Sequence, residues 1–292
     1  MSRGRRTPET TVTVRALRGR IAEGCGRFST APEVNHANAV ATVRAAYDAG
    51  LRVFDTARAY ATVGDPLHNE RLLTLALRDR DDVIIMTKGG HFRSGVAQWG
   101  IDNTPARLRR DVDDSLRALE RDRLDLYYLH RADGPVDILE SFGALEELRR
   151  AGKIGAIGIS NATVAQIEVA ATACRLTAVQ NRLVAGERSD SLRCAERLGL
   201  AFFAYSPLGG PAHAKDLPQR FPALAKVAAK RHRSVHALAL RGMLADSDAV
   251  SAIVGIGSPR RAAETAAVPS TPWDDECARA WAADIDHPRA DP

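Results

Sequence analysis

The chain has 292 residues, a formal net charge of +5, 45% hydrophobic residues and 26% charged residues. This balance is ordinary for a globular protein with a sizeable core, and it excludes an intrinsically disordered chain. Arg and Lys are interspersed with Asp and Glu, which is typical of solvated helix faces and argues against a nucleic-acid-binding protein.

Short β-branched apolar runs alternate with longer amphipathic stretches between residues 20 and 267. In chain order, we predict strands at 20–24, 52–54, 83–86, 124–129, 154–159, 178–180, 201–204 and 250–254. We predict helices near 37–49, 69–79, 105–120, 137–151, 163–173, 189–198, 222–245 and 259–267. Because a helix follows each strand, the sequence indicates an α/β fold of the (β/α)8, or TIM barrel, type. We expect one domain across residues 1–292, with mobile ends of about a dozen residues each.

Two segments are too rich in Pro, Gly and polar residues for a regular element, so we predict long loops at 89–103 and 205–221. Loops at the C-terminal face of a barrel shape the substrate pocket. The side chains of these loops that could line a pocket are His91, Phe92, Arg93, Trp99 and His213. Aromatic rings beside an arginine and two histidines would suit a polar cyclic or partly anionic substrate.

Polar residues stand where the predicted strands end. Asp55 follows the second strand and Tyr60 lies in the loop after it, while Lys88 ends the third strand and His130 the fourth. The strands of a (β/α)8 barrel converge at one mouth, where enzymes of this fold carry their chemistry. A single polar strand end is commonly a cap or a turn, whereas four titratable side chains at one mouth predict a catalytic group.

These four side chains suit the delivery of a proton to a carbonyl oxygen. A free tyrosine has a pKa of about 10, and a nearby ammonium such as that of Lys88 lowers it by favouring the tyrosinate. Asp55 would keep Lys88 protonated and oriented. His130 could donate a hydrogen bond to the substrate oxygen, so we predict Tyr60 as the general acid.

Five strings resemble the aldo-keto reductase family in their order and spacing. They are Val-Phe-Asp-Thr-Ala-Arg-Ala-Tyr at 53–60, Met-Thr-Lys-Gly-Gly at 86–90, Leu-Tyr-Tyr-Leu-His at 126–130, Ile-Gly-Ile-Ser-Asn at 157–161 and Ala-Tyr-Ser-Pro-Leu-Gly-Gly at 204–210. The resemblance implies hydride transfer from NADPH to a carbonyl carbon, with the catalytic positions filled by Asp55, Tyr60, Lys88 and His130.

The resemblance also implies a cofactor site along the later strands. The residues that match the family's nicotinamide contacts are Ser160, Asn161, Gln180 and Tyr205. Those expected at the pyrophosphate are Ser206, Pro207, Leu208 and Gly209, and those expected at the adenosine end are Gly255, Gly257, Ser258, Arg261, Glu264 and Thr265. Arg261 is the expected contact of the 2′-phosphate, which distinguishes NADPH from NADH.

The sequence departs from the family at three places. Gly255 stands where many relatives carry a lysine, and Glu264-Thr265 stands where they carry Glu-Asn, so NADH is an alternative to NADPH. Glu23 lies in a segment that is only loosely like the family's glycine-rich start, and it could alter the barrel mouth or the substrate.

Two other functions stay open at this stage. Lys88 could be the nucleophile of a Schiff-base aldolase, which would require a neutral lysine and is opposed by Asp55. Alternatively, a regulatory or accessory subunit could bind the cofactor with little turnover. The sequence specifies neither the carbonyl substrate nor the oligomeric state.

The four cysteines, Cys25, Cys174, Cys194 and Cys277, lack the spacing of a disulfide framework or a zinc site. No apolar run reaches the roughly 20 residues of a membrane span, and no signal-peptide pattern follows the first residues. We therefore expect a cytoplasmic enzyme with reduced thiols and no metal, which acts on a small molecule and binds neither membranes nor nucleic acid.

Overall fold

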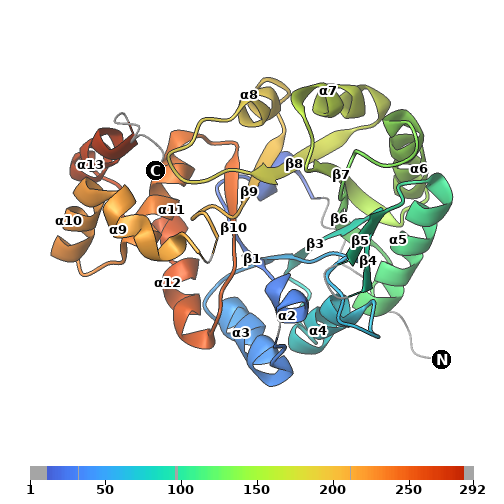
Figure 1. Ribbon diagram of the computed structural model, residues 1–292, viewed down its shortest axis with the longest axis horizontal. Helices are drawn as coiled ribbons and strands as arrows, with labels where there is room; N and C mark the ends of the chain where they lie inside the picture. Colours follow the sequence, from blue (N-terminus) through green and yellow to red (C-terminus); the bar gives the residue numbers. More distant parts are fainter. Residues whose placement is uncertain (1–11, 32, 96–97, 211, 286–292) are drawn as a thin grey trace.

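The computed structural model describes residues 12–31, 33–95, 98–210 and 212–285. Within these residues, eight parallel strands close into a barrel in the order β1-β10-β9-β8-β7-β6-β3-β2, with helices around it (Figure 1). The barrel strands are β1 (Ile21–Gly24), β2 (Val53–Asp55), β3 (Ile84–Gly89), β6 (Leu124–Leu129), β7 (Ile154–Ser160), β8 (Leu176–Arg182), β9 (Ala201–Tyr205) and β10 (Val250–Val254). The predicted TIM barrel is thereby confirmed.

The helices lie outside the strands. They are α1 (Val14–Leu17), α2 (Arg27–Thr30), α3 (His36–Asp48), α4 (His68–Ala76), α5 (Pro105–Leu119), α6 (Ile138–Arg150), α7 (Val164–Ala173), α8 (Asp190–Arg197), α9 (Leu217–Arg220), α10 (Pro222–Lys230), α11 (Val235–Asp246), α12 (Ala262–Ala266) and α13 (Asp275–Ile285). Their starts follow local chemistry, since Thr104 accepts a hydrogen bond from the backbone of Arg107 ahead of α5, and Thr163 and Gln166 form a capping box on α7.

Alternation along the strands divides the core into two layers. Every second strand residue faces the barrel lumen, where ten buried apolar side chains pack together, among them Val53, Met86, Tyr128 and Phe203. The intervening residues, such as Phe54 and Tyr127, pack against the helices. Gly158 leaves room for the Tyr128 ring, because a Cβ at this position would lie 2.4 Å from it. The lumen is therefore packed below the mouth.

Two expected loops contain regular structure. The segment 89–103 carries the antiparallel hairpin of β4 (His91–Gly95) and β5 (Gln98–Ile101). The segment 205–221 carries a 3₁₀ turn, Ala214–Asp216, and then α9. Predicting both as irregular was wrong, because Gly and Pro weaken a local pattern without excluding pairing across a hairpin or a short helix.

The later part of the chain also corrects the prediction. One helix was expected over 222–245, but His232 has a φ of +52° and Ser234 caps a second helix, so α10 and α11 are separate. The helix expected at 259–267 is a 3₁₀ turn, Pro259–Arg261, followed by α12. Helix α13 lies beyond the expected core and packs on α10 and α11, with Trp281 buried (Figure 1). Residues 1–11 and 286–292, expected as mobile ends, lie outside the described part.

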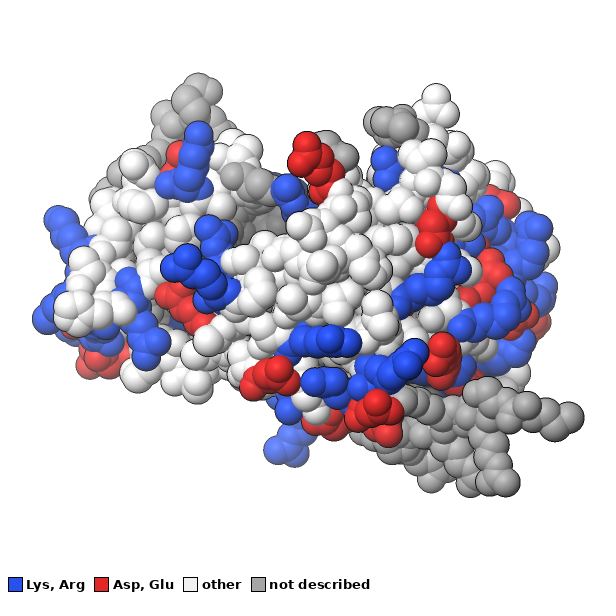
Figure 2. Space-filling model, turned by 90° about the horizontal axis from the view of Figure 1, so that it is seen from below, with Lys and Arg blue, Asp and Glu red and all other residues white. Residues whose placement is uncertain are grey.

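The surface and the thiols add little that is unusual. On the face in Figure 2, basic and acidic side chains lie beside one another around an uncharged centre. All four cysteines are free. Among the described residues, no helix is long and apolar enough to cross a membrane, and no three His, Cys, Asp or Glu side chains form a group that could hold a metal ion.

Candidate active site

The polar strand ends that the sequence singled out occupy the lumen-facing positions at the barrel mouth. Asp55 is two residues beyond the lumen residue Val53, Lys88 two beyond Met86, and His130 two beyond Tyr128. The same spacing brings Ser160, Gln180 and Tyr205 to the mouth from β7, β8 and β9. The strand period of two thus decides which side chains meet.

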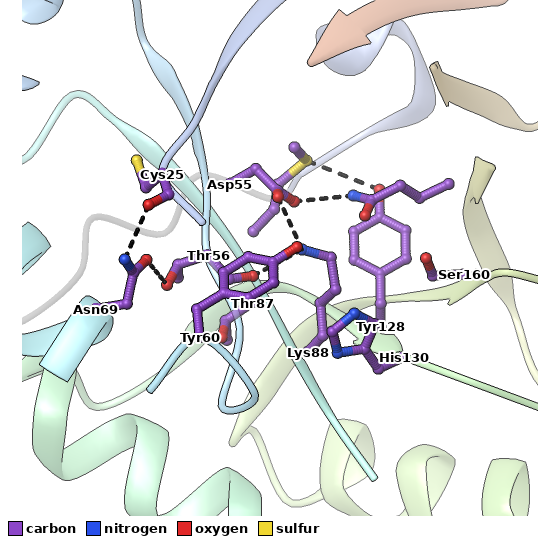
Figure 3. Close-up of polar contacts among 12 residues, drawn as sticks. Cys25, Asp55, Thr56, Tyr60, Asn69, Thr87, Lys88, Tyr128, His130 and Ser160 are labelled. Atoms are coloured by element: carbon purple, nitrogen blue, oxygen red, sulfur yellow. Dashed lines mark hydrogen bonds and ion pairs between the residues drawn. The ribbon is translucent and has the colours of Figure 1, made fainter. Parts of the chain in front are cut away.

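Lys88 is the centre of the first group. Its side chain is fully buried, and its Nζ atom lies 2.8 Å from Asp55 Oδ2, 2.8 Å from the Thr56 carbonyl oxygen and 3.3 Å from the Tyr60 hydroxyl (Figure 3). These three contacts use all three ammonium donors. Burial lowers the pKa of Lys88, but its interactions with Asp55 and Tyr60 together raise it by more, so the ammonium form is held.

Tyr60 is held by the loop after β2. Its backbone N–H donates to the Ala57 carbonyl oxygen. Arg58 fixes the same loop, because its backbone N–H donates to the Lys88 carbonyl oxygen and its guanidinium forms an ion pair with Asp114. Gly26 lies behind the ring, where a Cβ would come within 3.3 Å of it. The tyrosine hydroxyl accepts from Lys88, so its own proton is free to be donated to a neighbouring oxygen.

Burial decides the protonation state of Tyr60. Desolvation raises the pKa of its hydroxyl, the Lys88 ammonium lowers it, and the net pKa lies above the usual value. We expected a lowered pKa from the ammonium alone, and the partial burial of the ring is what overturns that expectation. Tyr60 is therefore a protonated acid at neutral pH, with Lys88 limiting how weak an acid it becomes.

His130 stands next to Tyr60, with the two rings edge to face and their centroids 5.8 Å apart. Burial, followed by the positive charge of Lys88, holds the pKa of His130 well below its usual range. The imidazole is therefore neutral. Its Nδ1 atom is enclosed and has no partner, so the N–H that can reach a ligand is on Nε2.

Asn69 is a buried polar residue that the sequence reasoning missed. Its amide donates to the Cys25 carbonyl oxygen at 2.9 Å and accepts from Thr56 Oγ1 at 2.7 Å (Figure 3). The amide also donates to Ser29 Oγ at 2.7 Å. It thereby joins the loops after β1 and β2 behind Tyr60. The available signal was a polar residue on the apolar stripe of the helix, at the spacing of Leu72, Leu73 and Ala76.

The expected nicotinamide contacts bond to one another and to the first group. The Asn161 amide donates to the His130 carbonyl oxygen at 3.0 Å and accepts from the Tyr205 hydroxyl at 2.7 Å. Gln180 donates to Asp55 Oδ1 at 2.9 Å, and Ser160 is buried beside Asn161. The structure therefore brings all four residues together at the mouth, next to Lys88 and His130.

The expected phosphate contacts lie on two neighbouring loops. After β9, Ser206 has a φ of +52° and Gly209 of +83°. The Gly209 N–H donates to the Ser206 carbonyl oxygen, so it closes a turn around Pro207 and Leu208. After β10, Gly255, Gly257 and Arg261 are exposed, Ser258 and Thr265 are half-buried, and Glu264 is exposed and accepts from the backbone of Ser234.

The predicted pocket residues divide between two faces of the β4–β5 hairpin. His91 and Trp99 stack at a centroid distance of 5.3 Å, and His91 contacts the His130 ring at 4.9 Å. Phe92 faces the other way, where it packs against Gly100 and Arg107. Among the remaining candidates, Arg93 donates to backbone carbonyl oxygens of Ser29, Ala61 and Gly95, and His213 lies beside Gly209.

Glu23 does not line the mouth as we had considered. It alternates with the lumen residue Ala22 and shares the outer face of β1 with Ile21. Its side chain is fully buried, neither carboxylate oxygen has a hydrogen-bond partner, and burial raises its pKa to about 8. Glu23 is therefore a buried, mostly protonated acid in the layer between barrel and helices.

Known proteins resemble this chain in sequence. The sequence model of the "Aldo/keto reductase family" matches residues 20–283. An uncharacterized oxidoreductase of Schizosaccharomyces pombe is 33% identical over 178 residues, and a Glycine max protein called "Probable aldo-keto reductase 1" is 32% identical over 175 residues. These alignments cover 60% and 58% of this chain but only 57% and 49% of the relatives, so the chain spans about half the length of the curated relatives it matches.

Solved structures match over nearly the whole chain. A glycerol dehydrogenase from Gluconobacter oxydans superposes with a TM-score of 0.78 at 26% identity, covering 93% of this chain and 94% of that one. An aldo/keto reductase from Klebsiella pneumoniae in complex with NADP and acetate superposes with a TM-score of 0.76 at 25% identity, covering 92% of both chains.

Proposed function

Since this chain belongs to the aldo/keto reductase family of oxidoreductases, we propose that it reduces an aldehyde or ketone to an alcohol with NADPH and that Tyr60 is the general acid. The observation that carries the proposal is the buried contact of the Lys88 ammonium with both Asp55 and the Tyr60 hydroxyl. A protonated lysine whose three donors are all engaged is a poor nucleophile, which argues against the Schiff-base aldolase.

The first step for this chain's residues is to hold the carbonyl oxygen. The Nε2–H of His130 and the hydroxyl of Tyr60 both reach the mouth, so the oxygen receives two hydrogen bonds that strengthen as negative charge develops on it. Neutral His130 orients the oxygen without giving up its proton.

The second step is the proton transfer. As the carbonyl carbon gains a hydride, the electron pair of the C=O bond moves to the oxygen, which takes the Tyr60 proton and becomes a hydroxyl. The Lys88 ammonium stabilises the resulting tyrosinate, and Asp55 keeps that ammonium in place. A proton from solvent then restores Tyr60. The products are the alcohol and the oxidised nicotinamide.

The residues at the later strands fit a nicotinamide dinucleotide. Ser160, Asn161 and Gln180 would hold the carboxamide, and Tyr205 the flat ring. When bound, reduced nicotinamide supplies the hydride, which no side chain can provide. Ser206, Gly209 and Gly210 have left-handed backbone, a conformation that recurs in anion-binding loops. Exposed Arg261 would contact the 2′-phosphate, which favours NADPH over NADH. We place the enzyme in the cytoplasm, in keeping with its free cysteines.

The test is NADPH oxidation with a panel of small aldehydes and ketones, compared with the Tyr60→Phe variant. We expect the variant to lose about 10²–10⁴-fold in kcat, the usual contribution of a positioned acid, while NADPH affinity measured by fluorescence titration stays nearly constant. Tight NADPH binding with no turnover by the unmodified protein would instead support an accessory subunit. Full turnover by Tyr60→Phe would remove Tyr60 from the mechanism.

A further inference from the structure

Four rings form a row across the barrel mouth. From the acid outward they are Tyr60, His130, His91 and Trp99, with successive centroid distances of 5.8, 4.9 and 5.3 Å. The first two belong to the proposed catalytic group. His91 comes from β4 of the hairpin and contacts both His130 and Trp99, so it is the next polar side chain beyond the carbonyl position.

The imidazole rings of His91 and His130 have the same hydrogen-bonding environment. In both rings the Nδ1 atom is enclosed and has no hydrogen-bond partner. Placing the proton on Nδ1 would leave a buried donor unpaired, so the neutral ring carries it on the open Nε2 atom. Burial, followed by the charge of Arg131, lowers the pKa of His91, which keeps the ring neutral. Two N–H donors therefore lie side by side at the mouth.

The arginine side chains near His91 are hydrogen-bonded to other groups of the protein. The Arg93 guanidinium donates to three backbone carbonyl oxygens. Arg131 forms two hydrogen bonds to Asp133, at 2.9 and 2.8 Å. The donors of Arg93, the arginine in our expectation of a partly anionic substrate, are thus directed at backbone oxygens. Besides the Tyr60 ring, the His91 ring contacts the His130 ring, and the His91 ring carries a second open donor.

We propose that His91 is a specificity-determining residue that donates a hydrogen bond to a second substrate oxygen, on the carbon next to the reacting carbonyl. Building on the reductase function proposed above, the substrate class is then an α-hydroxy carbonyl or a 1,2-dicarbonyl compound. Two oxygens on neighbouring carbons match two donors whose rings are 4.9 Å apart. Trp99, whose ring centroid lies 5.3 Å from that of His91, adds an apolar surface beside them.

The test compares matched substrates that differ only in the second oxygen: propanal with 2-hydroxypropanal, and butan-2-one with 3-hydroxybutan-2-one. An adjacent oxygen activates a carbonyl by itself, so the informative quantity is how the ratio of kcat/KM within each pair changes with the variant. His91→Phe keeps the ring and removes the donor, His91→Gln restores an amide donor, and Gln98→Ala on the exposed part of the same hairpin is the control.

We expect His91→Phe to lower the hydroxylated-to-plain ratio about tenfold, as the loss of one hydrogen bond does, with the plain substrates almost unaffected. His91→Gln should recover part of the ratio, and Gln98→Ala should keep it. An unchanged ratio in His91→Phe, or an equal loss on both members of a pair, would overturn the role of His91 while leaving the reductase function intact. No turnover of any substrate by the unmodified protein would instead reject the proposed function, and this inference with it.

Discussion

The two halves of the barrel mouth are organised differently. On the side of β2, β3 and β6, Lys88 is fully buried and has three fixed partners, and Tyr60 is backed by Gly26. On the side of β7 to β10, Asn161 and Tyr205 bond to each other, and Arg261 is exposed. In the function proposed above, the proton side is already arranged for its task, whereas the cofactor side would exchange protein partners for ligand atoms. This difference predicts that variants of the first half lower kcat and variants of the second half raise KM.

The largest effect within this contrast is expected from Lys88→Met. Removing the ammonium leaves burial as the dominant influence, so the already raised pKa of Tyr60 rises further and the acid weakens. We expect kcat to fall by about 10²-fold or more. Because reduction needs protonated Tyr60, the alkaline limb of the kcat profile should move to higher pH. A limb that moves to lower pH would contradict the assignment of Tyr60 as the acid.

A control is needed because Lys88→Met also leaves the buried Asp55 carboxylate without its cationic partner. An unpaired buried charge costs about 3–5 kcal/mol, so thermal unfolding has to be measured alongside the rates. The double variant with Asp55→Asn removes both charges. It should regain stability and not rate if Lys88 acts on the proton transfer, whereas recovery of the rate would show that Lys88 serves only the fold.

The next effect concerns β1, the strand that joins the two halves between β10 and β2. The pKa of Glu23 is about 8 in the folded protein and about 4.3 in an unfolded chain. The folded state therefore binds the extra proton, and stability is greatest below the unfolded pKa and falls as pH rises toward 8. At pH 7 the difference between the two pKa values lowers the free energy of unfolding by about 3 kcal/mol. Glu23→Gln, which cannot ionise, should remove that decline.

The measurement for Glu23 is urea unfolding at pH 5, 7 and 8 for both proteins. The difference in unfolding free energy between Glu23→Gln and the unmodified chain should grow with pH. Since Glu23 faces the helix layer, kcat at pH 7 should be the same in both folded proteins. A constant difference across pH would mean that Glu23 ionises normally and is reached by water.

The smallest effect is expected on the cofactor side. Arg261→Ala removes an exposed guanidinium from the proposed 2′-phosphate contact, and KM for NADPH should rise about tenfold, as for one charge-assisted hydrogen bond. KM for NADH and kcat for both cofactors should change little. Arg260→Ala, next along the same 3₁₀ turn, is the matched control. Equal changes for NADPH and NADH would assign the discrimination to another residue.

The sequence predicted the positions of the polar strand ends at the mouth well because strand periodicity carries that information. Once β2, β3 and β6 are recognised as parallel strands, a period of two places Asp55, Lys88 and His130 on the same side as Val53, Met86 and Tyr128. The chemistry of these residues could then be inferred from their types alone. Tyr60 was placed at the mouth only by its short distance along the chain from Asp55, since it lies on a loop whose path has no period.

Tertiary contacts decided what the sequence left open. The direction of the Tyr60 pKa shift depends on how completely the ring is enclosed, and the strand pattern does not specify that. The hydrogen bond between Gln180 and Asp55 joins segments that are distant in the chain, and the hairpin that carries His91 depends on cross-strand pairing that the composition of the segment did not indicate. Local pattern thus determined the strands, the barrel and the residues at its mouth, because these follow from periods of two and 3.6. Burial and partner choice are properties of the packed molecule, and they alone fixed the protonation states and the neighbours of each site residue.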